Sequence, residues 1–229
     1  MKTTRQIIVI LLLLASINLY SQTIKFDERR FDSNHVSVAI EKVMGKMALR
    51  VVKDSTVKEA DEPTFARTKE IDFSNGTIEV SVLSRLLKNA PATARGFIGV
   101  AFRINDTDSQ FECIYIRPTN GRADDQVRRN HSIQYFSFPD YKFDRLRKES
   151  PEKYESYADM GLNEWIKLKI EVNGDKARLY VNDAKQPTLI VNDLKHGNSS
   201  GGVGLYVDNG TEGFFTEVKV EEMRRSMHA

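Results

Sequence analysis

Cysteine is almost absent from this chain, and tryptophan is equally scarce. Among 229 residues there is one cysteine, Cys113, and one tryptophan. A single cysteine excludes an internal disulfide and any redox or zinc motif built from paired cysteines. Cys113 lies within an apolar, strand-like segment, so we expect a buried thiol that serves packing.

The chain also lacks an excess of charge of either sign. Its formal net charge is +2, which includes Lys2 and Arg5 at the N-terminus. A chain this close to neutrality offers no electrostatic footprint for nucleic acid or for an anionic membrane surface. We therefore expect neither nucleic acid nor a membrane surface as a partner.

Long apolar runs are lacking except at residues 7–15. Basic Lys2 and Arg5 precede this run, and small residues follow it near Ser21. That pattern is typical of a secretory signal peptide, and the run is shorter than an ordinary membrane span. We predict a signal peptide at residues 1–21, cleaved after Ser21, which leaves no membrane span and a secreted or periplasmic protein. Residues 22–229 are predicted to form a single domain.

The strongest local pattern lies at residues 164–182. Two runs of alternating apolar and polar residues flank Asn173-Gly174, a pair typical of two-residue hairpin turns. A turn closed between Val172 and Asp175 places apolar side chains opposite one another on one face. The expected pairs are Ile170 with Ala177, Leu168 with Leu179 and Ile166 with Val181 on that face, and Glu171 with Lys176, Lys167 with Tyr180 and Lys169 with Arg178 on the other.

Short strand-like segments dominate the rest of the chain, and helical periodicity is weak. These segments are 36–40, 47–52, 76–83, 97–104, 111–117, 132–138, 188–191, 202–207 and 214–220. Residues 53–63 are predicted to form a polar, mobile stretch, and residues 148–160 to hold one short helix. Many short strands separated by Gly, Asn and Asp turns are typical of sandwiches and barrels. The sequence therefore predicts an all-β fold, an antiparallel jelly-roll β-sandwich.

The order of these segments resembles that of the concanavalin A-like lectin/glucanase superfamily. The resemblance is carried by residues 76–80, 96–103, 111–118, 164–165 and 202–205, and by a last strand ending at Val220. It covers residues 31–220 and is nearest to secreted 3-keto-disaccharide hydrolase-like and family 16 glycoside hydrolase-like domains. It implies a concanavalin A-like fold and carbohydrate recognition or chemistry, without fixing one activity.

The chain departs from the family 16 pattern at the catalytic strand. Those enzymes carry a Glu, an Asp and a second Glu on one strand. The nearest string here, residues 70–75, contains Glu70 and Asp72 but lacks the second Glu. The family's catalytic carboxylates are therefore not carried over to this chain.

A polar segment at residues 117–131 is the most unusual part of the sequence. It links two strands and contains almost no apolar residue. Loops held by a rigid scaffold often bind ligands, and Arg, Asp and Asn side chains suit sugar hydroxyls or a carboxylate. On the neighbouring strands, Arg103, Tyr115 and Arg117 are expected to share an open, concave face. The predicted ligand-binding residues are Arg103, Tyr115, Arg117, Asn120, Arg122, Asp124, Asp125, Arg128, Asn130, His131, Gln134 and Tyr135. The alternative is a solvated loop in which Arg and Asp pair internally.

The sequence leaves the catalytic residues open. Glycoside hydrolysis commonly uses two carboxyl groups. A pair in this chain would join Asp124 or Asp125 to a residue from elsewhere, such as Glu112 or Asp140. His131 is a candidate general base, and its alternative role is that of a hydrogen-bonding residue at the start of a strand.

Neither a cofactor nor a metal site is predicted. No set of His, Cys and carboxylate residues has the spacing of zinc ligands. A calcium ion among Asp106, Asp108 and Asp208-Asn209 is the alternative, although these residues form no calcium-binding motif.

Three functions are compatible with the sequence. The first is a secreted protein that recognises a glycan through the concave face and the 117–131 segment. The second is a glycoside hydrolase-like enzyme that acts on oligo- or polysaccharide with a non-standard carboxylate site. The third is a protein-binding adhesion module, which fits the fold but has no specific residues in its favour.

Overall fold

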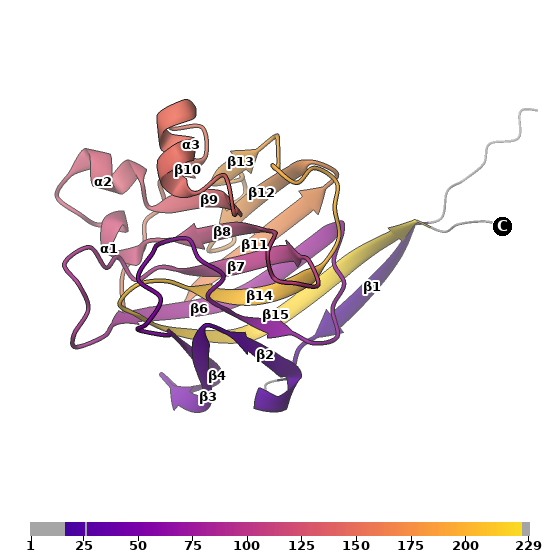
Figure 1. Cartoon of the computed structure of the whole chain (residues 1–229), viewed down its shortest axis with the longest axis horizontal. Coiled ribbons are helices and arrows are strands. Elements are labelled where there is room, and N and C mark those ends of the chain that lie inside the picture. Colours follow the sequence, from indigo (N-terminus) through magenta and orange to yellow (C-terminus); the bar gives the residue numbers. More distant parts are fainter. Residues whose placement is uncertain (1–16, 26, 226–229) are drawn as a thin grey trace, which may run out of the picture.

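The computed structural model of the chain describes residues 17–25 and 27–225. Most of the predicted signal peptide, residues 1–21, lies outside the described residues, so its cleavage stays a prediction. The described residues form two antiparallel sheets with a few short helices (Figure 1). None of the described helices is long and apolar enough to cross a membrane.

The first sheet has eight strands and the second has seven. The first follows the order β13 (Leu189–Val191), β12 (Lys176–Val181), β11 (Ile166–Asn173), β6 (Gly76–Leu86), β15 (Thr211–Arg225), β4 (Lys46–Lys53) and β3 (Val36–Val43), and β1 (Ile17–Thr23) also pairs with β15. The second follows the order β10 (Glu155–Ser156), β9 (Ile133–Phe138), β8 (Phe111–Ile116), β7 (Ile98–Ile104), β14 (Gly202–Val207), β5 (Phe65–Thr68) and β2 (Phe31–Asn34). A 3-10 helix, η1 (Glu28–Arg30), precedes β2.

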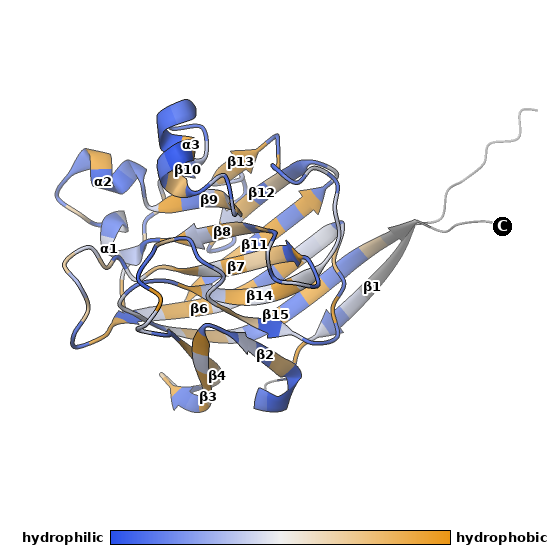
Figure 2. Ribbon diagram, in the orientation of Figure 1, coloured by the Kyte–Doolittle hydropathy of each residue, from blue (hydrophilic) through white to orange (hydrophobic). Residues whose placement is uncertain are grey.

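The two sheets enclose an apolar core. On β11, Ile166, Leu168 and Ile170 are fully buried, whereas Lys167 and Lys169 between them are partly exposed. Figure 2 shows this kind of alternation as orange and blue bands along the strands. Each such Leu or Ile contributes roughly 1.5–3 kcal/mol when it is fully buried. The predicted all-β antiparallel sandwich is confirmed.

The predicted hairpin is present, but its predicted register is wrong. The turn is Gly174-Asp175, closed by Asn173 and Lys176. Gly174 has φ +61° and is the first of two loop residues, which is the position that requires glycine in a type II′ turn. The observed pairs are Leu168 with Val181, Ile170 with Leu179 and Val172 with Ala177 on one face, and Lys169 with Tyr180 and Glu171 with Arg178 on the other. A displacement by two residues keeps every side chain on its face, so the apolar pattern fits both registers.

The outer face of the second sheet is covered, which corrects the predicted open, concave surface. Ala101 and Tyr115 on this face are at most 1% exposed. The segment between β4 and β5, expected to be mobile, lies against it. The backbone N–H of Asp61 donates to Asp208 Oδ2 at 3.0 Å, and Asp61 Oδ2 accepts from the backbone N–H of Phe143 at 2.7 Å. Figure 1 shows this segment in violet in front of β7 and β14.

Short helices occupy the chain between β8 and β10. The polar 117–131 segment, predicted as a loop, holds α1 (Pro118–Gly121) and α2 (Gln126–Asn130). Asp125 caps α2, because its side chain accepts from the backbone N–H groups of Val127 and Arg128. The short helix expected within residues 148–160 lies earlier in the chain, as α3 (Phe143–Glu149). It ends just before Pro151, since proline disfavours helical geometry in the residue that precedes it.

Candidate functional site

Three strand ends meet at one edge of the second sheet. Ile98 at the start of β7 pairs with Ile116 at the end of β8 and with Val207 at the end of β14. A cavity of about 330 Å³ lies just beyond these strand ends. We call it the arginine cleft, because four arginines line it. Its lining residues are Ala60, Thr93, Arg95, Phe97, Tyr115, Arg117, Asn120, Arg128, His131, Phe143, Arg147, Asp208 and Asn209.

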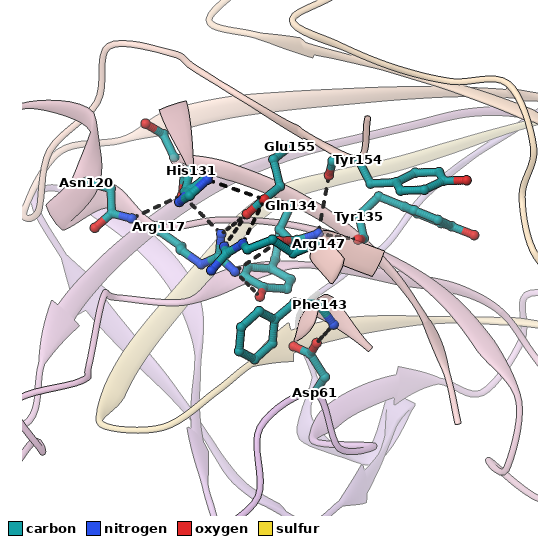
Figure 3. Close-up of polar contacts among 12 residues, drawn as sticks. Asp61, Arg117, Asn120, His131, Gln134, Tyr135, Phe143, Arg147, Tyr154 and Glu155 are labelled. Carbon is teal, nitrogen blue, oxygen red and sulfur yellow. Dashed lines mark hydrogen bonds and ion pairs between the residues drawn. The ribbon is translucent and has the colours of Figure 1, made fainter. Parts of the chain in front are cut away.

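Arg117 is buried in the wall of the arginine cleft. Its Nη1 donates to the backbone oxygen of His131 at 3.1 Å, and its Nη2 donates to the Tyr115 hydroxyl at 2.8 Å. The guanidinium carbon lies 5.0 Å from the ring centre of Tyr115, 6.0 Å from that of Phe97 and 5.7 Å from that of Phe143. Because aromatic faces attract cations, these rings fix the guanidinium in place, and Figure 3 shows Phe143 beside Arg117.

Glu155 of β10 holds three basic side chains at the cleft. Its carboxylate oxygens lie 3.3 Å from Arg117 Nη1, 3.0 Å from Arg147 Nε and 3.5 Å from His131 Nε2 (Figure 3). The hydrogen bonds with Glu155 raise the pKa of Arg147. Burial lowers the pKa of His131, and the charges of Arg147 and Arg117 add to this against the opposite effect of Glu155. His131 is therefore neutral at pH 7 and able to accept a proton.

Two buried acids, Asp61 and Asp208, lie beneath the cleft. Asp208 Oδ1 accepts from Lys53 Nζ at 2.6 Å, and Asp208 Oδ2 accepts from the Tyr206 hydroxyl at 3.1 Å. Burial, followed by the charge of Asp208, raises the pKa of Asp61 to about 7. Asp61 Oδ1 has no hydrogen-bond partner among the described residues. Beneath the cleft, Asp208 is thus paired with a lysine, whereas burial and the charge of Asp208 raise the pKa of the Asp61 carboxyl group to about 7.

Arg95 and Arg128 complete the lining of the cleft. Arg95 Nη1 donates to the backbone oxygens of Ala92 and Ala94, each at 2.8 Å. Arg128 Nη2 donates to Asn120 Oδ1 at 3.3 Å, while Arg128 Nε is buried and has no hydrogen-bond partner in the described chain. Burial, with the charges of Arg128 and Arg117, lowers the pKa of Arg95. These two side chains leave donor capacity for a ligand.

The arginine cleft brings together Tyr115, Arg117, Asn120, Arg128 and His131 of the predicted site. Gln134 lies behind them, fully buried, and its Oε1 accepts from Arg117 Nη2 at 3.2 Å. The other predicted residues do not line this cavity.

Arg103 lies at the opposite end of β7 from the cleft. Its φ of +54° and the register shift at Gly202/Val203 place it in a β-bulge. The bulge breaks the alternation that would have put it beside Tyr115. Its guanidinium is bound instead by the backbone oxygens of Ser74, Gly174 and Gly197, at 2.7, 2.7 and 2.6 Å.

Arg122 is at the surface, where its side chain is 55% exposed. Its Nε lies 2.8 Å from Asp159 Oδ1, and its Nη2 lies 3.1 Å from Glu164 Oε1. The alternative prediction for residues 117–131 was a solvated loop in which Arg and Asp pair with one another. Arg122 does pair with acidic residues, but both of its partners lie outside that segment.

The remaining predicted residues also lie away from the cleft. Asp124 is exposed, Asp125 caps α2, and Asn130 Oδ1 accepts from Gln126 Nε2 at 2.8 Å. Tyr135 is buried between the sheets.

Several lining residues were missed at the sequence level. Arg95 lies three residues before β7 and Arg117 directly follows β8, so antiparallel pairing of these strands places both at one edge. That spacing was an available signal for Arg95. Phe143 and Arg147 had no comparable signal, because α3 reaches the cleft only through tertiary packing.

The carboxylates predicted as a catalytic pair are not brought together. Glu112 is fully buried between the sheets, where it accepts from the Tyr135 hydroxyl at 2.7 Å and from the backbone N–H of His196 at 2.8 Å. Asp124 and Asp125 are exposed beside α2, and Asp140 follows the far end of β9.

The residues of the calcium alternative have other partners. Asp108 pairs with Arg67 at 2.6 Å and Asp208 pairs with Lys53 at 2.6 Å. Within the described residues, no group of three or more His, Cys, Asp or Glu side chains is placed to hold a metal ion.

The fold and the cleft define a class of protein: a concanavalin A-like antiparallel β-sandwich with a cationic cleft at one sheet edge. Residues 25–221 match the family of the 3-keto-alpha-glucoside-1,2-lyase-like domain, and the chain belongs to this family. The membership confirms the resemblance noted in the sequence and relates the chain to proteins of sugar chemistry.

Solved structures that share the fold include two from Bacillus subtilis. The carbohydrate binding module CBM66 from Bacillus subtilis has a TM-score of 0.53 and 15% identity, and the match covers 82% of this chain and 97% of that one. A protein of unknown function with a galectin-like fold from Bacillus subtilis has a TM-score of 0.51 and 11% identity, over 93% and 99% of the two chains. At these identities the similarity establishes the fold alone. No match to this sequence is found among the curated proteins.

Proposed function

We propose that the protein binds a carbohydrate in the arginine cleft and that it does so outside the cytoplasm. The observation that carries the proposal is the buried Nε of Arg128, which lines a cavity of about 330 Å³ and has no acceptor among the described residues. Cavities of roughly 300–1,000 Å³ are typical of small-molecule sites. Half-buried Phe97 and Phe143 supply ring faces for a sugar, and Asn120 and Arg128 supply polar contacts for its hydroxyls.

Further support comes from the family and the fold. The family is named for a domain that resembles a glucoside lyase, and one protein of similar fold is a carbohydrate binding module. The basic, then apolar, then small-residue pattern of residues 1–21 supports the extracellular or periplasmic location.

A thermal-shift screen against mono- and oligosaccharides tests the proposal. A ligand at a hundred times its dissociation constant stabilises the protein by about 2.7 kcal/mol, which shifts the melting temperature by several degrees. We expect Arg128→Gln to reduce the shift and Arg122→Gln to preserve it, because Arg122 lies outside the cleft. Retention of the full shift in Arg128→Gln would place the sugar elsewhere.

Catalysis at the same cleft is a second candidate function. The observation that favours it is the position of His131 in the cleft lining, where burial lowers its pKa. In a 3-keto-glucoside, the hydrogen on C2 is acidified by the C3 carbonyl. A base such as His131 removes this proton, the C–H electrons form a C1=C2 double bond, and the C1–O bond breaks. The aglycone leaves with that electron pair and is protonated, while the neighbouring guanidiniums stabilise the negative charge that develops on the C3 oxygen. This elimination needs no pair of carboxylates, unlike the glycoside hydrolase alternative.

Release of a chromogenic aglycone from a 3-keto-glucoside tests this candidate. We expect a rate that rises as His131 loses its proton below pH 6.5 and that is lost in His131→Gln. If the sugar binds without release of the aglycone and its thermal shift persists overnight, the binding function is kept and the lyase function is rejected.

A further inference from the structure

Two of the four guanidiniums in the arginine cleft form ion pairs with a carboxylate. Glu155 forms ion pairs with Arg117 and Arg147. The carboxylate in the lining, Asp208, pairs with Lys53. Within residues 17–25 and 27–225, the structure gives no ion pair to Arg95 or Arg128.

Arg95 and Arg128 line the same cavity, so their positive charges oppose one another. The charges of Arg128 and Arg117 both lower the pKa of Arg95, in addition to the effect of its burial. Arginine stays protonated in proteins, so the two side chains keep like charges in a partly buried site. Such an arrangement destabilises the unliganded protein unless a counter-charge enters.

The hydrogen-bond donors of this pair are also incompletely used. Arg95 gives Nη1 to two backbone oxygens of its own loop, and Arg128 gives Nη2 to Asn120 at 3.3 Å. Arg128 Nε is buried with no partner in the described chain. An oxyanion between the two guanidiniums would accept from donors that the protein leaves free, with the strength of charge-assisted bonds.

The two arginines also join two cavities. Both line the arginine cleft, and both line a neighbouring cavity of about 460 Å³ with apolar walls that include Leu86, Pro91 and Ala92. An anionic substituent at this junction would therefore lie beside both guanidiniums.

From these contacts we infer that the sugar carries an anionic oxygen group, such as a carboxylate or a sulfate or phosphate ester, held between Arg95 and Arg128. This inference rests on the proposed sugar site and specifies the class of its ligand.

Calorimetric titration of the full chain with matched sugars tests the inference. The probes are methyl glucoside, glucuronate, glucose 6-sulfate and glucose 6-phosphate, with inorganic sulfate and phosphate alone as further probes. We expect at least one acidic sugar to bind about tenfold or more tightly than the neutral glucoside and than the free ion. Its affinity should fall as salt is raised, because salt screens the charges.

Variants locate the anionic group. Arg95→Gln and Arg128→Gln should each weaken the acidic sugar about tenfold more than they weaken the neutral sugar, as expected for loss of a charge-assisted contact. Arg95→Lys and Arg128→Lys should recover part of the affinity, and Arg122→Gln is the matched control with paired guanidinium. Melting temperatures at least equal to that of the native protein would show that both Gln variants fold.

The outcomes separate the inference from the proposed function. Equal affinity for neutral and acidic sugars would overturn the inference and keep the sugar site. Unchanged acidic-sugar affinity in both Gln variants would overturn the inference and place the sugar outside the arginine cleft. Binding of the free ion as tightly as the acidic sugar would also overturn it. Binding of no sugar at all would overturn the proposed function, and the inference with it.

Discussion

Lys53 and Asp208 form a buried ion pair beneath the arginine cleft. Lys53 Nζ lies 2.6 Å from Asp208 Oδ1, and the two side chains are 4% and 2% exposed. Lys53 Nζ also donates to the backbone oxygen of Glu59 at 2.5 Å. The pair joins the end of β4 to the end of β14 and so fixes the segment between β4 and β5 over the second sheet.

Replacement of Lys53 by methionine should strongly destabilise the protein. The change leaves the Asp208 carboxylate buried without its cation, which commonly costs 3–5 kcal/mol, so we expect a loss of roughly that size in the free energy of unfolding. Urea unfolding measures it. The double variant Lys53→Met/Asp208→Asn should recover part of the loss, because it removes the unpaired charge. A loss below about 1 kcal/mol in the single variant would show that other contacts hold the segment.

The titration of Asp61 should make stability fall as the pH rises. The pKa of Asp61 is about 7 in the folded protein, against an ordinary value of 3.8. Between these values the folded state binds the proton that the unfolded state has lost. Binding of this proton therefore stabilises the folded protein fully below about pH 4. The stabilisation is lost as the pH rises through 7, and the free energy of unfolding falls by up to about 1.4 kcal/mol per pH unit.

Asp61→Asn should lack this slope. Urea unfolding of the native protein and of the variant from pH 4.5 to 8 measures the difference between their curves. Asp54→Asn is a control in the same segment, since Asp54 is exposed and its pKa is lowered by hydrogen bonds from Thr56. Parallel curves for the native protein and Asp61→Asn would contradict the assignment of a raised pKa to Asp61.

The sequence predicted faces better than registers. Alternation correctly placed Ile166, Leu168 and Ile170 on the buried side of β11. It did not fix the partner of each residue, because a displacement by two residues preserves both faces. The backbone of the turn decides between the registers. An Asn173-Gly174 turn of type I′ needs a positive φ at both residues, and of the two only Gly174 has one.

A pair of turn variants tests the observed register. Gly174→Ala should destabilise the protein by about 1–2 kcal/mol, because alanine disfavours positive φ. A Cβ at this position meets no atom within 4 Å, so the effect is purely one of the backbone. Asn173→Ala should have little effect, since Asn173 is a strand residue opposite Lys176. Chemical unfolding measures both, and a larger loss for Asn173→Ala than for Gly174→Ala would favour the predicted register.

The candidate site was only partly visible in the sequence. The polar composition of residues 117–131 pointed to Arg117, Asn120, Arg128 and His131, which do line one cavity. The same composition gave equal weight to Arg122, because local sequence does not distinguish a side chain that turns inward from one that pairs at the surface. The segment between β4 and β5 was expected to be mobile because it is polar, yet Asp61 within it is buried through long-range contacts.

Arg117 and Arg122 should therefore behave in opposite ways when each is replaced by methionine. Arg117 is buried and binds Tyr115, His131 and Glu155, so Arg117→Met leaves several buried groups without a donor. We expect a loss of about 3 kcal/mol in the free energy of unfolding, together with loss of ligand binding. Exposed ion pairs contribute little, so Arg122→Met should change neither the melting temperature nor the affinity appreciably. Thermal melts and titrations of the two variants in parallel measure this contrast. If Arg117→Met kept its stability and lost only the ligand, Arg117 would be a direct ligand contact rather than the residue that positions the cleft wall.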